Sequence, residues 1–209
     1  MSDVVVGGDG VRRCRWPGED ALYIGYHDTE WGHAEEEDAA LFEKVALEGF
    51  QAGLSWITVL RKREAFRKHF AGFDPEKVAR FGKRQIGKML ADPAIIRHRG
   101  KIESAINNAR CTVAAIEEHG SLAALIWPFA PRTGPAPRGF GDLAAETPAS
   151  AALSKELKRR GWTFVGPTTM HAMMQALGMV NDHLVGCHAR AECERLRRPV
   201  VRRYSALGV

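Results

Sequence analysis

Apolar residues recur along much of this chain at three- and four-residue intervals, which is the spacing of one face of an α-helix. Residues 38–52 show the pattern clearly, with Leu41, Val45 and Ala52 along one stripe. Glu48 lies in the same stripe, among these apolar neighbours. A buried carboxylate is costly unless it is hydrogen-bonded or paired. Glu48 is therefore either a structural buried acid or the polar floor of a pocket.

Start and stop signals divide the rest of the chain into further helices. Proline and aspartate open several of them, and glycine or proline ends them. The expected helical segments are residues 55–69, with Ser55 as cap, a short helix opened by Asp74-Pro75, two helices within 83–109 joined by a tight hairpin at Asp92-Pro93-Ala94, a continuation over 110–126, and helices opened by Thr147-Pro148 and Gly166-Pro167.

The two ends of the chain and one internal segment lack this periodicity. Residues 1–11 are expected to be a flexible leader and residues 189–209 a mobile, arginine-rich tail. Residues 128–148 are rich in proline and glycine, which predicts an irregular loop. The folded domain would then span residues 12–188, and its division into two helical subdomains with a pocket between them is left open.

Composition and charge narrow the class of protein. The chain has 209 residues, 26% of them charged and 45% hydrophobic, which is typical of a globular protein. No apolar run approaches the roughly 20 residues of a spanning helix, and no secretory signal opens the chain. We therefore expect a cytosolic monomer with no membrane association. The net charge of +5, gathered in basic clusters, favours a polyanionic partner.

One basic cluster lies in the expected helical hairpin, at the start of its second helix. Backbone N–H groups left free there, with basic side chains alongside, would form a phosphate-binding seat. Helical hairpins are common, however, and the Gly-x-Gly turn of well-known DNA-binding hairpins is missing. The pattern alone therefore leaves phosphate binding open. The residues concerned are Arg97, Arg99, Gly100 and Lys101.

Aromatic residues are concentrated near the start of a chain that is only 8% aromatic. Trp16, Tyr23, Tyr26 and Trp31 lie within sixteen residues. They form either a small satellite core or the lining of a site for a flat ligand. Trp56 follows Glu48 by eight residues. An aromatic ring near a carboxylate would offer a flat cation a stacking face and a hydrogen-bond acceptor.

Cysteine and histidine pairs stand at the two ends of the expected domain. Cys14 and His27 lie near its start, and His183 and Cys187, one helical turn apart, lie near its end. Such a set suits a closed, tetrahedral Zn²⁺ site that holds structure. Because the long gap matches no short zinc motif, buried thiols and satisfied histidines are an equal alternative. The rival ligands are His33, His188 and Cys193.

Six blocks of the sequence resemble the bacterial 3-methyladenine DNA glycosylase I family, the constitutive type, within the helix-hairpin-helix glycosylase superfamily. They cover most of residues 12–188 in the order and spacing of that family. The blocks are Cys14-Arg-Trp16, residues 22–32, 47–64, 95–102 and 158–166, and Asn181-Asp-His183.

The resemblance implies an all-α, helix-hairpin-helix glycosylase fold whose N- and C-terminal segments are joined by a structural zinc site. It also implies a monofunctional enzyme that hydrolyses the N-glycosidic bond of 3-methyladenine in alkylated double-stranded DNA. Glu48 and Tyr26 would hydrogen-bond the extruded base, and Trp56 would stack on it. The rings of Trp16, Tyr23 and Trp31 would complete the pocket, and Cys14, His27, His183 and Cys187 fall on the family's zinc ligands.

Three features depart from the family pattern. Phe50 stands where a polar residue is expected, Pro93-Ala94 replaces a hairpin glycine, and the arginine-rich extension after Cys187 is additional. A base within duplex DNA must leave the stack to react. Leu54 is a candidate wedge for the gap it leaves, although a core leucine is the alternative.

Two other classes of protein remain open. One is a non-catalytic, zinc-containing DNA-binding module, and the other is a hydrolase of a small cationic heterocycle. No lysine is expected among the pocket residues, which disfavours a lyase that forms a Schiff base.

Overall fold

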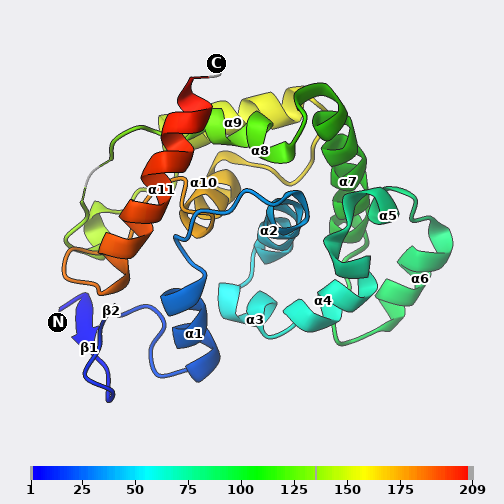
Figure 1. Cartoon of the computed structure of the whole chain (residues 1–209). Coiled ribbons are helices and arrows are strands. Elements are labelled where there is room, and N and C mark those ends of the chain that lie inside the picture. The colour runs from blue at the N-terminus through cyan, green and yellow to red at the C-terminus, as the bar shows by residue number, and fades with distance from the viewer. Residues whose placement is uncertain (1, 135, 207–209) are drawn as a thin grey trace.

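Helix α2 (Asp38–Gln51) lies at the centre of the molecule, with other helices around it (Figure 1). This computed structural model describes residues 2–134 and 136–206. The fold is mostly helical, as expected, with two short strands that the sequence did not predict. The other elements are β1 (Val4–Val6), β2 (Arg12–Cys14), α1 (Ala21–Thr29), α3 (Trp56–Leu60), α4 (Arg63–His69), η1 (Ala71–Phe73), α5 (Pro75–Ala79), α6 (Lys83–Ala91), α7 (Arg99–His119), α8 (Leu122–Ile126), η2 (Trp127–Phe129), η3 (Phe140–Asp142), α9 (Pro148–Arg159), α10 (Pro167–Ala176) and α11 (Ala189–Ser205).

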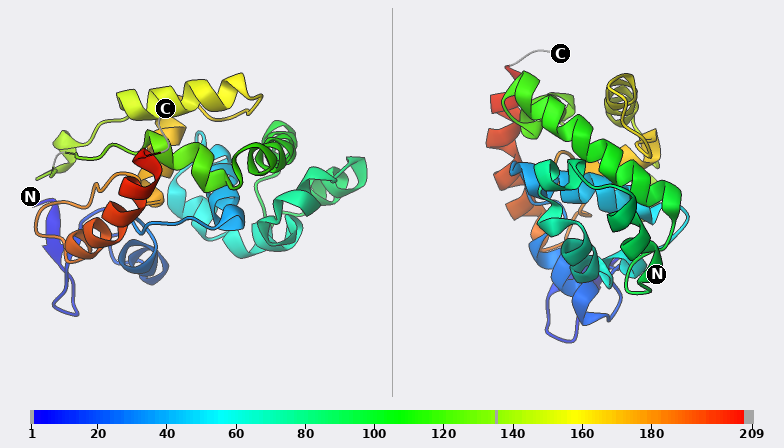
Figure 2. Two further views of the ribbon diagram at one scale, coloured as in Figure 1. Left: turned by 45° about the horizontal axis from the view of Figure 1, so that its top comes forward. Right: turned by 90° about the vertical axis from the view of Figure 1, so that its right-hand side faces the viewer.

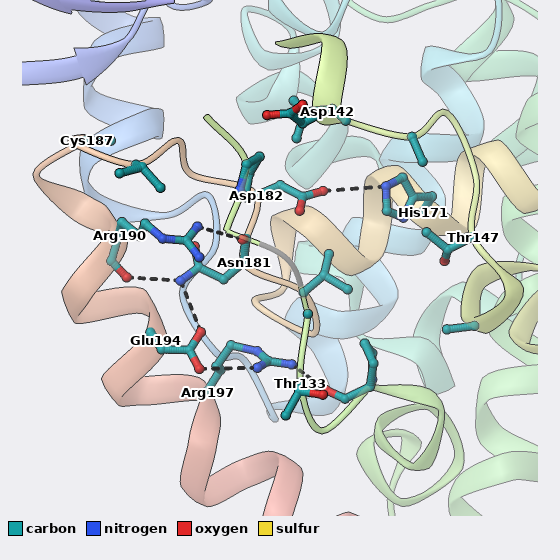
Figure 3. Close-up of a pocket in the computed structure, with 18 of the residues that line it drawn as sticks. Thr133, Asp142, Thr147, His171, Asn181, Asp182, Cys187, Arg190, Glu194 and Arg197 are labelled. Atoms are coloured by element: carbon teal, nitrogen blue, oxygen red, sulfur yellow. Dashed lines mark hydrogen bonds and ion pairs between the residues drawn. The ribbon is translucent and has the colours of Figure 1, made fainter. Parts of the chain in front are cut away.

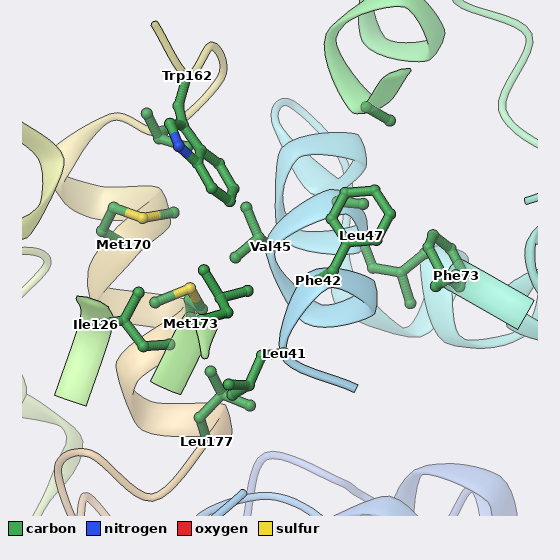
Figure 4. Close-up of a cluster of buried hydrophobic side chains, with 14 of the residues drawn as sticks. Leu41, Phe42, Val45, Leu47, Phe73, Ile126, Trp162, Met170, Met173 and Leu177 are labelled. Carbon is green, nitrogen blue, oxygen red and sulfur yellow. The ribbon is translucent and has the colours of Figure 1, made fainter. Parts of the chain in front are cut away.

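The apolar faces of α2 explain its central place. Leu41 and Val45 lie toward α10, where Met173 fills the space between the helices (Figure 4). On the other side, the Phe42 ring meets Phe73 at a centroid distance of 5.9 Å. A helix that is apolar on most sides is buried rather than amphipathic. Glu48 is thus carried into the interior by its own helix.

Two of the expected helices are divided in the structure. The segment 55–69 forms α3 and α4, which are separate helices (Figure 1). The long helix over 99–126 ends at Gly120, whose φ of 84° is left-handed and suits glycine alone. Ser121 then caps α8 by accepting from the Ala124 N–H at 3.0 Å. Helices α6 and α7 are the two helices expected within 83–109, joined by residues 92–98.

The N-terminal segment is not a flexible leader. Strands β1 and β2 pair antiparallel, with Val4 opposite Cys14. Three consecutive valines favour a strand because β-branched side chains fit a pleated surface. Arg13 anchors this hairpin through Asp9, at 2.8 Å, and Asp28 at the end of α1, at 2.7 Å.

The C-terminal segment is likewise not a mobile tail, at least to residue 206. It forms α11, which lies along the same side of the molecule as the β hairpin in the views of Figure 2. Arg197 is only 3% exposed and donates to the carbonyls of Gly178, Met179 and Pro131. The arginine-rich composition of this segment therefore led to the prediction of a mobile tail, although one face of α11 is buried. Residues 207–209 of the predicted tail lie outside the described residues.

Residues 128–148 are largely irregular, as predicted, although η2 and η3 interrupt them. The segment runs from α8 to α9 and places η3 near the aromatic residues Trp16 and Tyr23. Among the described residues, no helix combines the length and the apolar character needed to cross a bilayer.

Candidate active site

Two cavities of the protein differ in their linings. The larger, of about 830 Å³, lies between α10, α11 and the 131–149 segment (Figure 3). Its charged side chains are largely engaged with the protein itself, as when Arg190 donates to the Asn181 carbonyl at 3.1 Å. Its described lining contains no Phe, Tyr or Trp. Because it lacks such rings, this cavity does not suit a flat, stacking ligand.

The smaller cavity, of about 320 Å³, is built mainly from aromatic rings around Glu48. It brings together α1, α2, α3, α10 and the η3 segment, which are distant in sequence. All six residues assigned to the pocket from the sequence line it. The lining consists of Trp16, Tyr23, Tyr26, Trp31, Glu48, Gln51, Trp56, Phe140, Leu143, Ala172 and Gln175.

Helix α1 sets the spacing of the rings. Asp20 caps it by accepting from the Tyr23 N–H at 3.1 Å, and Tyr23 and Tyr26 then fall on one face. Trp16 packs edge-on against Tyr23, with centroids 4.7 Å apart. Tyr26 lies 5.4 Å from Trp56 across the cavity wall. The rings therefore hold one another in place before any ligand arrives.

Glu48 is the acid at the floor of this cavity. It is 4% exposed, and no hydrogen bond or ion pair from the described residues reaches its carboxylate within bonding distance. Burial raises the pKa of Glu48 to about 7, and the charge of Lys44 opposes that rise. The carboxylate is thus free to accept from a ligand, and it needs a cation to be stable in its charged form.

Lys44 is a pocket neighbour that sequence reasoning missed. Its Nζ donates to the Tyr26 hydroxyl at 3.0 Å and lies 4.8 Å and 4.4 Å from the Tyr26 and Trp56 ring centroids. Lys44 is not itself a lining residue, but its ammonium lies against two of the lining rings. The sequence did contain a signal for this residue. Lys44 precedes Glu48 by four residues, so both side chains lie on one face of the helix.

Sequence reasoning also missed the remaining lining residues, most of which lie in segments that helical periodicity does not relate to Glu48. Gln51 follows Glu48 by one helical turn and could have been found from that spacing. Phe140 and Leu143 come from the irregular loop, and Ala172 and Gln175 come from α10. Phe50, which stands where the family pattern has a polar residue, is packed 4.5 Å from the Phe66 ring in the core.

The four expected metal ligands form a buried cluster. Their ligand atoms all lie within 4.8 Å of one another. The Cys187 sulfur lies 3.5 Å from His27 Nε2 and 3.5 Å from His183 Nδ1, and the Cys14 sulfur lies 3.9 Å from His183 Nδ1. Bonds of about 2.3 Å to sulfur and 2.0 Å to nitrogen in a tetrahedron imply S···N separations of roughly 3.5 Å.

The opposite ring nitrogens of the two histidines are also engaged. His27 Nδ1 lies 2.7 Å from an Asp28 oxygen, and His183 Nε2 lies 2.9 Å from the Trp31 carbonyl oxygen. These acceptors fix the ring protons on the far side and leave a lone pair facing the sulfurs. The rival ligands are placed differently, because His188 binds Asp28, and Cys193 lies beside His33.

The expected DNA-contacting residues divide into two groups. Leu54 is 42% exposed on the turn after α2, which Gly53 makes with a φ of 79°. Arg97 and Arg99 are exposed, and Gly100 lies in the first turn of α7. Lys101 does not belong with them: it is 8% exposed and donates to the Phe50 and Ala52 carbonyls. Its ammonium satisfies the C-terminal end of α2 and is not available to a phosphate.

A helical fold with a ring-walled, carboxylate-bearing cavity suits the binding of a flat, cationic ligand. The sequence model of the family described as methyladenine glycosylase matches residues 16–191. The chain therefore belongs to the methyladenine glycosylase family.

Named relatives agree with this assignment. DNA-3-methyladenine glycosylase 1 of Escherichia coli strain K12 is 47% identical over 180 residues, which cover 85% of this chain and 96% of the relative. A crystal structure of 3-methyladenine DNA glycosylase I superposes with a TM-score of 0.81 at 46% identity, covering 85% of this chain and 99% of that one. A variant of 3-methyladenine DNA glycosylase I in complex with 3-methyladenine also has a TM-score of 0.81, at 32% identity, with 85% of this chain and 97% of that one covered.

Proposed function

We propose that this protein is a DNA base-excision repair enzyme that hydrolyses the N-glycosidic bond of 3-methyladenine in alkylated DNA. The observation that carries the proposal is the buried, unpaired carboxylate of Glu48 in a cavity walled by rings. The names of relatives that cover most of this chain support the same activity.

The pocket selects as much as it catalyses. N3-methylation makes adenine cationic and weakens its bond to the sugar, so little acid catalysis is required. The Trp56 ring offers the cation a stacking face, and Glu48 accepts from the exocyclic amine. Burial and the nearby Glu48 charge raise the pKa of Tyr26 well above its usual value. The Tyr26 phenol therefore stays protonated and can donate to a ring nitrogen of the base.

The DNA would approach the face that carries Leu54 and the start of α7. Leu54 is an exposed apolar side chain three residues after the lining residue Gln51 and would fill the gap left by the flipped base. The backbone N–H groups of Arg99 and Gly100, with the Arg97 side chain, would bind a phosphate at the helix N-terminus. In this proposal α6 and α7 serve as the helix-hairpin-helix element, without a contribution from the Lys101 ammonium.

The Cys14, His27, His183 and Cys187 cluster fits a structural Zn²⁺ ion. Its two sulfurs and two nitrogens, their separations and the engaged far nitrogens suit a closed tetrahedral site. With four protein ligands no position stays open, so the ion would hold the chain ends and take no part in hydrolysis.

The test of the enzymatic proposal is release of free bases from DNA treated with a methylating agent. The wild-type protein is expected to release 3-methyladenine. Glu48→Gln keeps the shape of the side chain but removes its charge, and is expected to lower the release rate by about 100-fold or more. Binding of the same DNA should survive, because Glu48 lies in the pocket and not on the DNA-facing surface.

Other outcomes would favour the two rival classes. DNA binding without base release in the wild-type protein favours the non-catalytic module. Neither binding nor release, together with hydrolysis of a small methylated nucleoside, favours the small-molecule hydrolase.

A further inference from the structure

The Lys44 ammonium lies behind the wall of the cavity. Both rings that it contacts, Tyr26 and Trp56, line the cavity, whereas Lys44 does not. It is separated from a bound base by those rings. Any effect of Lys44 on a ligand is therefore transmitted through the two rings, through the Tyr26 hydroxyl or through its field.

The hydrogen bond from Lys44 determines what the Tyr26 hydroxyl can do. An ammonium only donates, so Tyr26 Oη must accept from Lys44 at 3.0 Å. The phenol has one proton, and no other side chain among the described residues bonds to this oxygen. That proton is thus left for an acceptor in the cavity. Without Lys44 the hydroxyl could rotate, and it would no longer be committed to donate there.

The surrounding charges leave Glu48 as the free counter-charge of Lys44. Glu30 is bound by Arg63 at 2.9 Å and Glu43 by Arg67 at 2.8 Å, so both nearby acids are already paired. From α1, the groups that face Glu48 are the neutral phenols of Tyr23 and Tyr26. Lys44 is therefore the positive group that offsets the buried carboxylate in the absence of a cationic base.

We propose that Lys44 is a positioning residue of the base pocket, which orients the Tyr26 hydroxyl as a donor and places a positive charge one helical turn before Glu48. The proposal rests on the proposed glycosylase function. It gives the pocket a resident cation that stabilises the empty site, while the methylated base adds its own charge in front of the rings.

Three substitutions of Lys44 separate the two roles. Lys44→Arg keeps charge and donor, Lys44→Gln keeps a donor without charge, and Lys44→Met removes both. Lys77→Met removes an exposed lysine charge from α5 and serves as the matched control. Thermal unfolding of each variant shows whether it is folded. Single-turnover release of 3-methyladenine from methylated DNA is then measured across pH 5–9.

The charge role makes a prediction for the acidic limb of the pH profile. The limb reports the loss of the Glu48 carboxylate as pH falls, and removing a neighbouring positive charge raises the pKa of an acid. We expect the limb to move up by about one pH unit in Lys44→Met and Lys44→Gln. It should stay in place in Lys44→Arg and in Lys77→Met. A merely structural role would lower the rate without moving the limb.

The orienting role is read from the affinity for free 3-methyladenine at pH 8.5, measured by tryptophan fluorescence and compared between Lys44→Gln and Lys44→Met, because burial lowers the pKa of Lys44 itself to about 8. Lys44→Met should bind about tenfold more weakly than Lys44→Gln, as expected for one committed hydrogen bond. Tyr26→Phe should remove the difference between them.

The outcomes also distinguish this inference from the proposed function. If the wild-type protein releases no 3-methyladenine, the glycosylase proposal fails together with this inference. If the wild type is active and folded Lys44→Met keeps both the acidic limb and the affinity of wild type, Lys44 has no positioning role and only this inference is overturned.

Discussion

Glu48 places a charge where the fold would otherwise prefer none. Its carboxylate is buried among rings and receives no hydrogen bond from the described residues. Such a group weakens the folded state whenever it is ionised, because the unfolded chain solvates it freely. The ionised carboxylate thus destabilises the empty pocket, and binding of a cationic base removes that destabilisation.

This cost predicts a pH-dependent gain in stability for Glu48→Gln. The folded-state pKa of about 7 lies above the usual value of 4.5, so ionisation of Glu48 destabilises the wild-type protein as pH rises through that interval. We expect the variant to be more stable by on the order of 3 kcal/mol at pH 8, with a gain that shrinks toward zero as pH falls to 4.5. Urea unfolding at several pH values measures it. A gain that does not vary with pH would mean that the charge is not its cause.

At this scale the sequence predicted the rings and the acid but not the groups that tune them. Helical periodicity located Glu48, and aromatic density located Trp16 and Tyr26. Lys44 was missed because a lysine on a helix is ordinarily read as a solvated side chain, and only the folded structure reveals two rings over its ammonium.

At the scale of elements, one side chain donates the hydrogen bonds that the last carbonyls of α2 lack. The last carbonyls of a helix have no N–H groups beyond them. Lys101, from the start of α7, donates to two of these carbonyls, those of Phe50 and Ala52. The bond joins the helix that carries Glu48 to the helix expected to face DNA, so the pocket and the DNA-facing surface are held in register.

Lys101→Met should therefore reduce stability and leave DNA contacts in place. A buried carbonyl, that of Phe50, and a part-buried one, that of Ala52, lose their donor, and the expected loss is about 2 kcal/mol. The salt dependence of DNA binding should be unchanged below the unfolding temperature. Arg97→Ala is the complementary control, since it should weaken DNA binding and flatten its salt dependence without lowering stability. If Lys101→Met instead weakened DNA binding and flattened its salt dependence without lowering stability, Lys101 would belong to the phosphate-binding residues.

The helices were largely predictable because caps, prolines and apolar spacing are local signals. The errors lie where local composition conceals a tertiary role. The arginines of α11 suggested a solvated tail, yet Arg197 finds three carbonyls in the interior. The valines of β1 were read as a leader because a strand is stabilised only by its partner, which lies further along the chain.

At the scale of the whole molecule, the Cys/His cluster ties the start of the folded chain to its end. The family match ends at residue 191, so most of α11 is an addition that packs beyond this tie. The cluster lies next to the pocket wall, since the Trp31 ring meets the His183 ring edge-on, with centroids 4.6 Å apart. Loss of the tie is therefore expected to loosen the aromatic wall as well as the termini.

Metal analysis of the purified protein tests the zinc proposal. We expect stoichiometric zinc, its loss in Cys187→Ala, and a fall in Tm of more than about 10 °C both in that variant and after treatment with a chelator. Cys111→Ala is the matched control, since Cys111 is a free cysteine outside the cluster and should change neither zinc content nor Tm by much. A zinc-free wild-type protein with the same Tm would remove the ion from the proposal.

The distance along the chain between the two halves of that cluster affects how the enzyme is made. Cys14 and His183 are 169 positions apart, and His27 and Cys187 are 160 apart. During synthesis on the ribosome, Cys14 and His27 are made early, and their partners His183 and Cys187 are added only near the end. The lining residues Phe140, Leu143, Ala172 and Gln175 are likewise added late in synthesis. A nascent chain released early should therefore be recognised and degraded by proteases before it can capture a damaged base.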